Sequence, residues 1–159
     1  MADMNSADFM GKKILIIEDD PLLHNLLSDK MKQLREKGVE VFPTMNAEEG
    51  LKQAQESKPD LIMLDLVLPT IDGFEFLQRL RAMPGFEKIP VIVLSNLSGD
   101  ADKERARSLG VIAYLVKADF SLSDISNAVE EILQGKQMST PKAPELGVKK
   151  TPWGYMAYL

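Results

Sequence analysis

The chain has no cysteine among its 159 residues and only one histidine. The absence of cysteine excludes disulfide bonds, thiolate zinc sites and cysteine nucleophiles, and a single histidine cannot build a multi-histidine metal site. Any metal ion must therefore be held by oxygen ligands. No apolar run approaches the length of a membrane span, and residues 1–13 lack the apolar core of a signal peptide. We therefore expect a cytoplasmic protein with no membrane partner.

The chain also lacks an excess of positive charge. Its 19 Lys and Arg against 24 Asp and Glu give a formal net charge of −5. This charge does not favour binding to the phosphate backbone of nucleic acids or to anionic membranes. Nucleic acid is therefore not an expected partner. Hydrophobic residues make up 45% and charged residues 27% of the chain, which is typical of globular proteins. Composition and length together predict one folded domain.

Short apolar runs of strand length alternate with segments of helical periodicity, as expected for βα units around a parallel sheet. Five such units can be counted, so the expected fold class is α/β. The third and fourth runs are continuously apolar, which is typical of strands covered by helices on both faces. The expected strands are residues 13–18, 39–42, 60–65, 90–95 and 111–117.

Apolar spacing and capping signals predict five helices. Pro21 fits the first position of a helix that should stop at Gly38, and Asn46 with Glu49 is typical of a capping box. The segment 100–109 has few apolar residues, so we expect it to pack most weakly and to be the best candidate for a moving element. The other expected helices are residues 73–83 and a helix capped by Ser121 and Asp124.

The composition changes near the C-terminus. Residues 135–159 hold three prolines, three glycines, four lysines and one acid, a charge of +3 against −8 for the remainder. We therefore divide the chain into an N-terminal extension (1–11), a domain (12–134) and a tail (135–159). The tail contains the one tryptophan, Trp153, and two of the three tyrosines, residue types enriched at interfaces. It is either a flexible extension or a segment that packs on its own domain, on a second copy or on a downstream partner.

Polar side chains follow four of the expected strands, although each strand is apolar up to that point. The carboxyl ends of parallel strands meet at one edge of a doubly wound sheet, where ligands bind. We therefore expect these side chains to meet at a common site. They are Glu18, Asp19 and Asp20 where the first strand ends, Asp65 at the end of the third, Ser95 at the end of the fourth and Lys117 at the end of the fifth.

Carboxylates that converge within a few ångströms repel one another, and protonation, a cation or both must relieve that repulsion. A hard dication such as Mg²⁺ binds carboxylates, water and phosphate oxygens, which suits an acidic edge without cysteine or histidine ligands. A carboxylate at the end of a buried strand can attack phosphorus and form an acyl phosphate, while a metal ion and a lysine neutralise the developing charge. Asp65 is the central candidate for this chemistry.

Four short motifs occur in order, each at the end of an expected strand or in its loop: IIEDD at 16–20, LDLVLPTIDG at 64–73, LS at 94–95 and YLVK at 114–117. With them, residues 12–134 resemble the receiver domain of bacterial two-component response regulators. The resemblance implies a CheY-like, flavodoxin-like fold with five parallel strands in the order 2-1-3-4-5 and five helices.

The resemblance also implies a function. A single-domain response regulator would accept a phosphoryl group on Asp65 from a sensor histidine kinase or a histidine phosphotransfer protein, with Mg²⁺, and would change its affinity for a downstream protein, with a homodimer left open. It would catalyse only its own phosphorylation and dephosphorylation, so it is not expected to be a metabolic enzyme. The implied roles are Glu18, Asp19, Asp65 and the backbone carbonyl of Val67 as magnesium ligands, Lys117 as partner of Asp65 and its phosphate, Ser95 as switch hydroxyl, Tyr114 as switch aromatic and Asp20 as a helix cap only.

The sequence departs from the family pattern in places. Ala118 stands where the family usually has proline, so the cis peptide common there is not expected. Asn96 stands where the family prefers a small residue. Val67 and Leu97 occupy positions that tune the lifetime of the phosphate, and neither can orient an attacking water molecule. They predict a long-lived phosphorylated state.

Three other functions are compatible with parts of the pattern. A degenerate receiver would act as a protein-interaction scaffold without phosphorylation. A phosphatase of the haloacid dehalogenase type would need a second acid two residues after its nucleophile, where this chain has Val67. A flavodoxin-like nucleotide binder would need glycines and hydroxyls after the first strand, where this chain has three acids.

Overall fold

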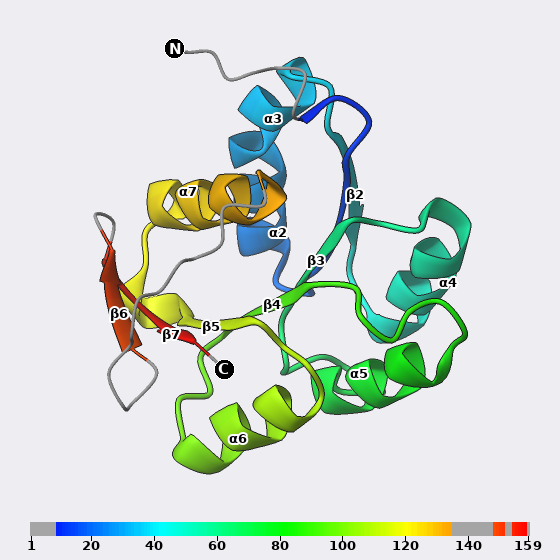
Figure 1. Cartoon of the computed structure of the whole chain (residues 1–159), viewed down its shortest axis with the longest axis vertical. Helices are drawn as coiled ribbons and strands as arrows, with labels where there is room; N and C mark the ends of the chain where they lie inside the picture. The colour runs from blue at the N-terminus through cyan, green and yellow to red at the C-terminus, as the bar shows by residue number, and fades with distance from the viewer. Residues whose placement is uncertain (1–8, 135–147, 152–153, 159) are drawn as a thin grey trace.

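The computed structural model describes residues 9–134, 148–151 and 154–158, with side chains in the first of these ranges. The described strands form one seven-stranded sheet in the order β2-β1-β3-β4-β5-β7-β6 (Figure 1). The first five strands are parallel in the predicted order 2-1-3-4-5, and β7 and β6 extend the sheet as an antiparallel hairpin. The strands are β1 (Lys13–Ile17), β2 (Glu40–Thr44), β3 (Leu61–Leu64), β4 (Val91–Ser95), β5 (Ala113–Val116), β6 (Val148–Thr151) and β7 (Gly154–Tyr158).

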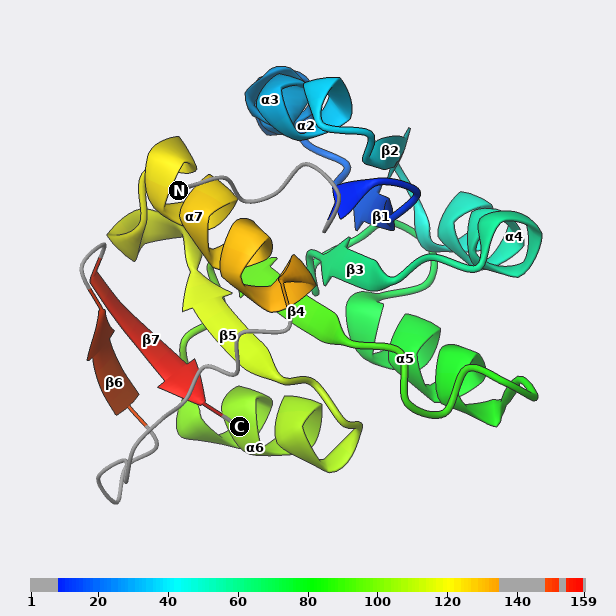
Figure 2. The ribbon, with the colours of Figure 1, turned by 45° about the horizontal axis from the view of Figure 1, so that its top comes forward.

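Helices cover both faces of the parallel strands (Figures 1 and 2). The first expected helix is divided at Met31, which is buried and has a ψ of 0° at the junction of two shorter helices. On one face lie α2 (Pro21–Lys30), α3 (Lys32–Glu36) and α7 (Leu122–Leu133); on the other lie α4 (Ala47–Ser57), α5 (Gly73–Ala82) and α6 (Asp100–Ser108).

The hydrophobic core has two layers, one on each side of the sheet. Because side chains alternate along a strand, Ile14 and Ile16 face the α2, α3 and α7 layer, whereas Leu15 and Ile17 face the α4, α5 and α6 layer. Every residue of β3 and β4 is buried, as their continuously apolar sequences predict. The sheet therefore holds the carboxyl ends of its strands in fixed positions.

The predicted helix caps are mostly confirmed. Ser121 and Asp124 form a complete capping box at the start of α7. The Asn46 side chain accepts a hydrogen bond from the Glu49 N–H at 2.8 Å. The Glu49 carboxylate, however, accepts from the Met45 N–H at 3.3 Å, so only half of the second predicted box forms.

Strand β2 extends further than expected, through Pro43 to Thr44. The strand lies at the edge of the sheet, where proline is tolerated because its missing N–H can face away from the neighbouring strand. The Thr44 hydroxyl donates to the Ile16 carbonyl at 2.9 Å, which fixes the end of β2 against β1.

Helix α6 has the thin apolar stripe that its sequence predicts. Ala106 is its one buried residue. A second contact comes from Arg105, whose guanidinium lies 4.2 Å from the centre of the Phe74 ring, a cation–π geometry that contributes about 0.5–1 kcal/mol when exposed. The helix is thus held by few contacts, and its motion remains a prediction.

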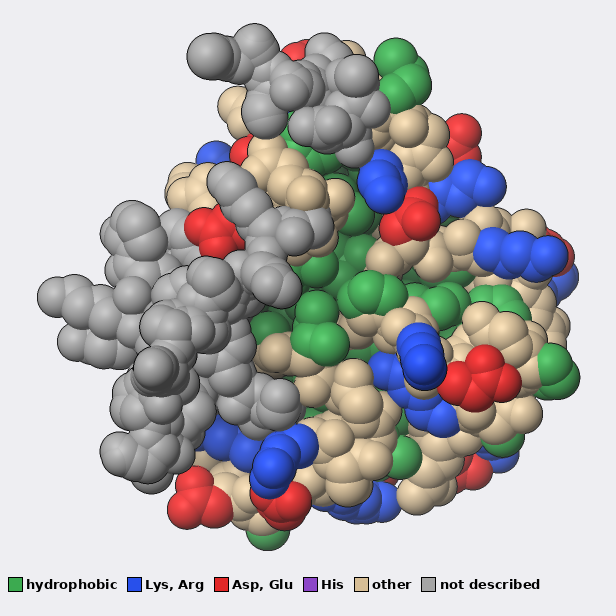
Figure 3. Space-filling model, in the orientation of Figure 1, with side chains coloured by type: hydrophobic (Ala, Val, Ile, Leu, Met, Phe, Trp, Pro, Cys, Tyr) green, Lys and Arg blue, Asp and Glu red, His purple; other side chains and the backbone are tan. Residues whose placement is uncertain are grey.

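The surface mixes both signs of charge. On the face shown in Figure 3, hydrophobic side chains are visible near the middle, while acidic and basic side chains are spread towards the periphery. None of the described helices is long and apolar enough to cross a bilayer.

The Arg81 side chain at the end of α5 joins two loops to that helix. Its guanidinium is half-buried, which lowers its pKa. All its described hydrogen bonds go to backbone carbonyls, at 2.8–3.2 Å: Phe86, Ile89, Leu109 and Gly110.

Replacing Arg81 with Met is expected to lower the free energy of unfolding by about 2 kcal/mol, because four carbonyls lose a charged donor. Urea unfolding followed by circular dichroism measures this loss. Arg79→Met is the matched control on the same helix. Its exposed ion pair with Glu75 contributes no more than about 0.5 kcal/mol. Equal effects of the two substitutions would contradict the bridging role.

Candidate functional site

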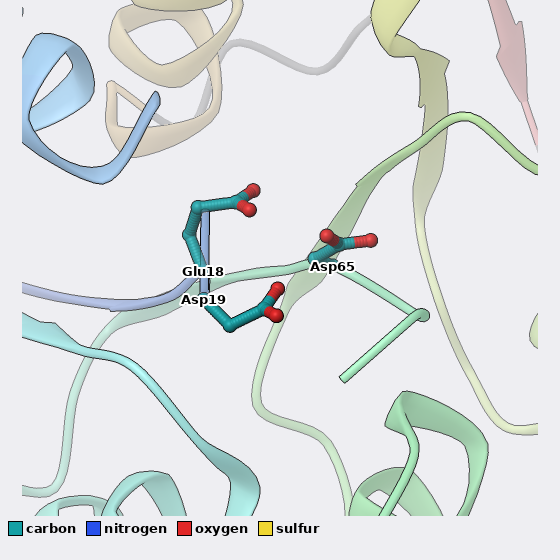
Figure 4. Close-up of side chains that lie close together, drawn as sticks. All are labelled: Glu18, Asp19 and Asp65. Atoms are coloured by element: carbon teal, nitrogen blue, oxygen red, sulfur yellow. The ribbon is translucent and has the colours of Figure 1, made fainter. Parts of the chain in front are cut away.

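Three carboxylates meet at the carboxyl end of the sheet. Glu18 and Asp19 follow β1 directly, and Asp65 follows β3. These neighbouring strands pair Ile17 with Leu64, so the next residue of each chain emerges beside the other. Ligand oxygens of the three acids lie within 4.8 Å of one another, and Figure 4 shows their side chains side by side.

Lys117 completes the cluster from the other side. It begins the 3₁₀ helix η1 (Lys117–Asp119), directly after β5, and β4 separates its strand from β3. Its Nζ lies 2.9 Å from Asp65 Oδ2 and 3.0 Å from Glu18 Oε1. Burial alone would lower the pKa of Lys117, but its hydrogen bonds to Asp65 and Glu18 and their charges raise it overall. The lysine is therefore held as a cation.

Glu18 is a buried acid of the cluster, and its pKa is raised. Its side chain is only 2% exposed. Burial, followed by the charge of Asp65, raises the pKa of Glu18 to about 7, although the Asp20 N–H and Lys117 lower it in part. Near neutral pH one lysine therefore does not balance all the acids of the site.

Backbone groups orient the acids. The Val67 N–H donates to Asp65 Oδ1 at 3.1 Å, and the Asp20 N–H donates to Glu18 Oε2 at 3.1 Å. The Asp20 carboxylate itself accepts from backbone N–H groups of α2, as its expected role as a helix cap requires. His24, the one histidine of the chain, has its Nδ1 3.2 Å from the Glu18 carbonyl oxygen.

Ser95 and Tyr114 are connected through the loop after β4. Ser95 is fully buried, and its hydroxyl accepts a hydrogen bond from the Leu97 N–H at 3.3 Å. The Leu97 carbonyl accepts from the Tyr114 hydroxyl at 2.7 Å. Burial, followed by the charges of Asp102 and Asp65, raises the pKa of Tyr114 to about 12, so the phenol stays a hydrogen-bond donor. The sequence did not reveal that Leu97 links the two side chains.

Each residue that departs from the family pattern lies within two positions of a site residue in the sequence. Val67 is 55% exposed, and Asn96 is also exposed. The described residues contain no cis peptide bond, as Ala118 leads us to expect. That the Val67 carbonyl is a metal ligand remains a prediction.

The donor set of the cluster fits a hard cation. Its ligand atoms are carboxylate oxygens, the type that Mg²⁺ and Ca²⁺ prefer. The raised pKa of Glu18 shows that a positive charge at this position would stabilise the ionised acids. The acidic cluster of the described residues could therefore bind a metal ion.

Comparisons with known proteins point to one family. The model of the response regulator receiver domain matches residues 14–130. The alkaline phosphatase synthesis transcriptional regulatory protein PhoP of Bacillus subtilis is 33% identical over 134 residues, covering 84% of this chain and 53% of that protein. The polar-differentiation response regulator DivK of Brucella anthropi is 35% identical over 108 residues, covering 68% of this chain and 85% of DivK.

Solved structures agree with the sequence relatives. The receiver domain of the Francisella response regulator 1452 is 27% identical, with a TM-score of 0.67 over 79% of this chain and 98% of that one. This chain spans about half the length of several curated relatives that it matches, PhoP among them. The matched region contains most of both core layers and every acid of the cluster, and we conclude that the chain belongs to the response regulator receiver domain family.

Proposed function

We propose that this chain is a single-domain response regulator of a cytoplasmic two-component system or phosphorelay. Asp65 accepts a phosphoryl group from a phosphohistidine of a sensor kinase or phosphotransfer protein, and the change alters affinity for a downstream protein. One observation carries this proposal: the Asp65 carboxylate is held between Lys117 Nζ at 2.9 Å and the Val67 N–H at 3.1 Å, beside two further acids.

The proposed reaction is an in-line displacement at phosphorus. An oxygen of Asp65 forms the new P–O bond, the bond between phosphorus and the histidine nitrogen breaks, and its electron pair stays on the imidazole. Lys117, already beside Asp65, neutralises charge that develops on the phosphoryl oxygens. Magnesium, held by Glu18, Asp19, Asp65 and the Val67 carbonyl, would supply further positive charge at these oxygens.

The proposed switch begins at Ser95. A phosphoryl group brings about −1.5 to −2 charge and three strong acceptors to the site. Ser95 would donate to it, and Tyr114 would respond through the loop after β4. Because α6 has one buried residue, a modest gain or loss of contacts there would shift the equilibrium between two arrangements. The chain then acts as a signalling phosphoacceptor without metabolic turnover.

Phosphorylation by a small donor tests the proposal. The purified chain is incubated with acetyl phosphate and Mg²⁺, and intact-protein mass spectrometry follows the gain of one phosphoryl group. We expect the gain with Mg²⁺ and none when EDTA removes the metal. A chain that takes up no phosphoryl group under any of these conditions would be a scaffold instead.

The phosphorylated state is expected to last for minutes or longer in the purified protein. Val67 and Leu97 present no polar side-chain atom to orient a water molecule for attack on the acyl phosphate. Mass spectrometry after removal of the donor measures the decay. Val67→Asn, at an exposed position, should shorten the lifetime several-fold because an amide can orient water. Loss of the phosphate from the unmodified chain within seconds would contradict this expectation.

A further inference from the structure

The β6–β7 hairpin occupies the edge of the sheet beside β5. Strand β7 pairs antiparallel with β5, with Ala113 opposite Tyr158 and Tyr114 opposite Ala157. The outer strand β6 pairs with β7 along its whole length. Figures 1 and 2 both show the hairpin next to β5 and away from β2, at the opposite side of the sheet.

Without this hairpin, β5 would be an edge strand. Edge strands present unpaired N–H and C=O groups that pair readily with another strand. The hairpin covers these groups over two residue pairs of β5. An isolated two-stranded hairpin is marginally stable in water, so a cap held by so short a ladder can be displaced by a small change in β5.

The same part of β5 is connected to the phosphorylation site. The backbone of Tyr114 pairs with Ala157 of the hairpin, while its hydroxyl donates to the Leu97 carbonyl. The Leu97 N–H in turn donates to Ser95. A continuous chain of contacts thus runs from Ser95 to the hairpin.

We propose that the hairpin is a releasable cap on β5, and that phosphorylation of Asp65 weakens its docking. The inference rests on the proposed function, because it needs Ser95 to turn towards a phosphoryl group. When it does, the Leu97 N–H loses its acceptor, the loop after β4 moves, and Tyr114 loses the carbonyl that fixes it. The backbone of Tyr114, which pairs with β7, is then no longer held in the position that favours this pairing. The uncovered edge of β5 and the freed hairpin form the surface that differs between the two states.

Amide hydrogen exchange of the full chain tests the cap. Beryllofluoride with Mg²⁺ serves as the phosphoryl mimic, and exchange is read in residues 113–116 and 154–158. We expect exchange in both segments to rise about fivefold with the mimic, the lower end of typical coupling between sites. Fluorescence of Trp153, which lies between the two strands in the sequence, should change in parallel.

Ala157→Pro is the variant that releases the cap. Strand β7 lies between β5 and β6, and proline is found essentially only on edge strands, so this substitution disfavours the inner position of β7. Exchange in residues 113–116 should then be high without the mimic and should not rise further with it. Ala157→Ser keeps the N–H and should behave as the unmodified chain. Because coupling is reciprocal, the proline variant should also bind beryllofluoride about fivefold more tightly.

The possible outcomes distinguish failure of the cap proposal from failure of the proposed function. If acetyl phosphate modifies Asp65 but exchange in both segments is unchanged by the mimic, the cap is not coupled and the inference fails while the function stands. If Ala157→Pro leaves β5 exchange unchanged, the hairpin does not cap β5 in solution. If Asp65 takes up no phosphoryl group, the function fails and the coupling fails with it.

Discussion

Asp65→Asn is expected to abolish uptake of a phosphoryl group from acetyl phosphate or from a phosphohistidine. The amide has no anionic oxygen to attack phosphorus, although it keeps the size of the side chain and an acceptor for the Val67 N–H. Intact-protein mass spectrometry and phosphate-affinity gels measure the loss, which should be complete within detection. Unfolding in urea should show that the variant remains folded, because removal of one of three crowded acids relieves repulsion.

Asp60→Asn provides the matched control. Asp60 immediately precedes β3, at the opposite end of the strand from Asp65, and its carboxylate accepts a hydrogen bond from the Lys13 N–H at 2.8 Å. An asparagine oxygen can make the same bond, so this variant should be phosphorylated as the unmodified chain is. Equal phosphorylation of both variants would place the acceptor on another residue and overturn the assignment.

Glu18 is expected to make the metal-free protein lose stability as pH rises. The folded-state pKa of about 7 exceeds the ordinary value of 4.5, so the folded state binds the proton more tightly than the unfolded state does. The resulting stabilisation is fully present below about pH 4.5 and is lost as pH rises through 7. At 1.36 kcal/mol per pKa unit, the loss amounts to about 3 kcal/mol.

Urea unfolding in EDTA between pH 4.5 and pH 8 measures this effect against Glu18→Gln. The difference in unfolding free energy between the two proteins isolates Glu18 from the other acids, and it should change over the pH window in favour of the glutamine variant. Magnesium should flatten the curve of the unmodified protein, because a bound cation favours the ionised carboxylate. Parallel curves for both proteins in EDTA would show that Glu18 titrates normally.

Most of the parallel fold could be predicted because its signals are local. Continuous apolar runs identify β3 and β4, and Ser121 with Asp124 identifies the start of α7. The meeting of Asp65 with Glu18 and Asp19 follows from one rule, that parallel strands end at the same edge. The division of the first helix at Met31 has no comparable signal, because the buried apolar residues Leu27, Met31 and Leu34 keep helical spacing across it.

Contacts that depend on side-chain reach could not be predicted in the same way. Lys117 was expected to pair with Asp65, but its second partner, Glu18, depends on how far the long side chain reaches from the end of β5. The Ser95 to Leu97 to Tyr114 connection depends on the course of one loop.

The hairpin was missed for a different reason. Its strands, VKKT and GYMAY, are only four and five residues long. An isolated two-stranded hairpin has little stability, so its formation depends on pairing with β5. For the tail, two alternatives were open: a flexible extension, or a segment that packs on its own domain, on a second copy or on a partner. Backbone pairing of β7 with β5 corresponds to packing on its own domain.

The hairpin also changes which strand forms one of the two outer margins of the sheet. One margin is β2, which includes Pro43, and the other is now β6, in which two of four residues are lysines. Proline and lysine are residues with which natural sheets discourage strand addition from neighbouring molecules. While the hairpin is in place, both outer strands therefore contain residue types that discourage the addition of a further strand.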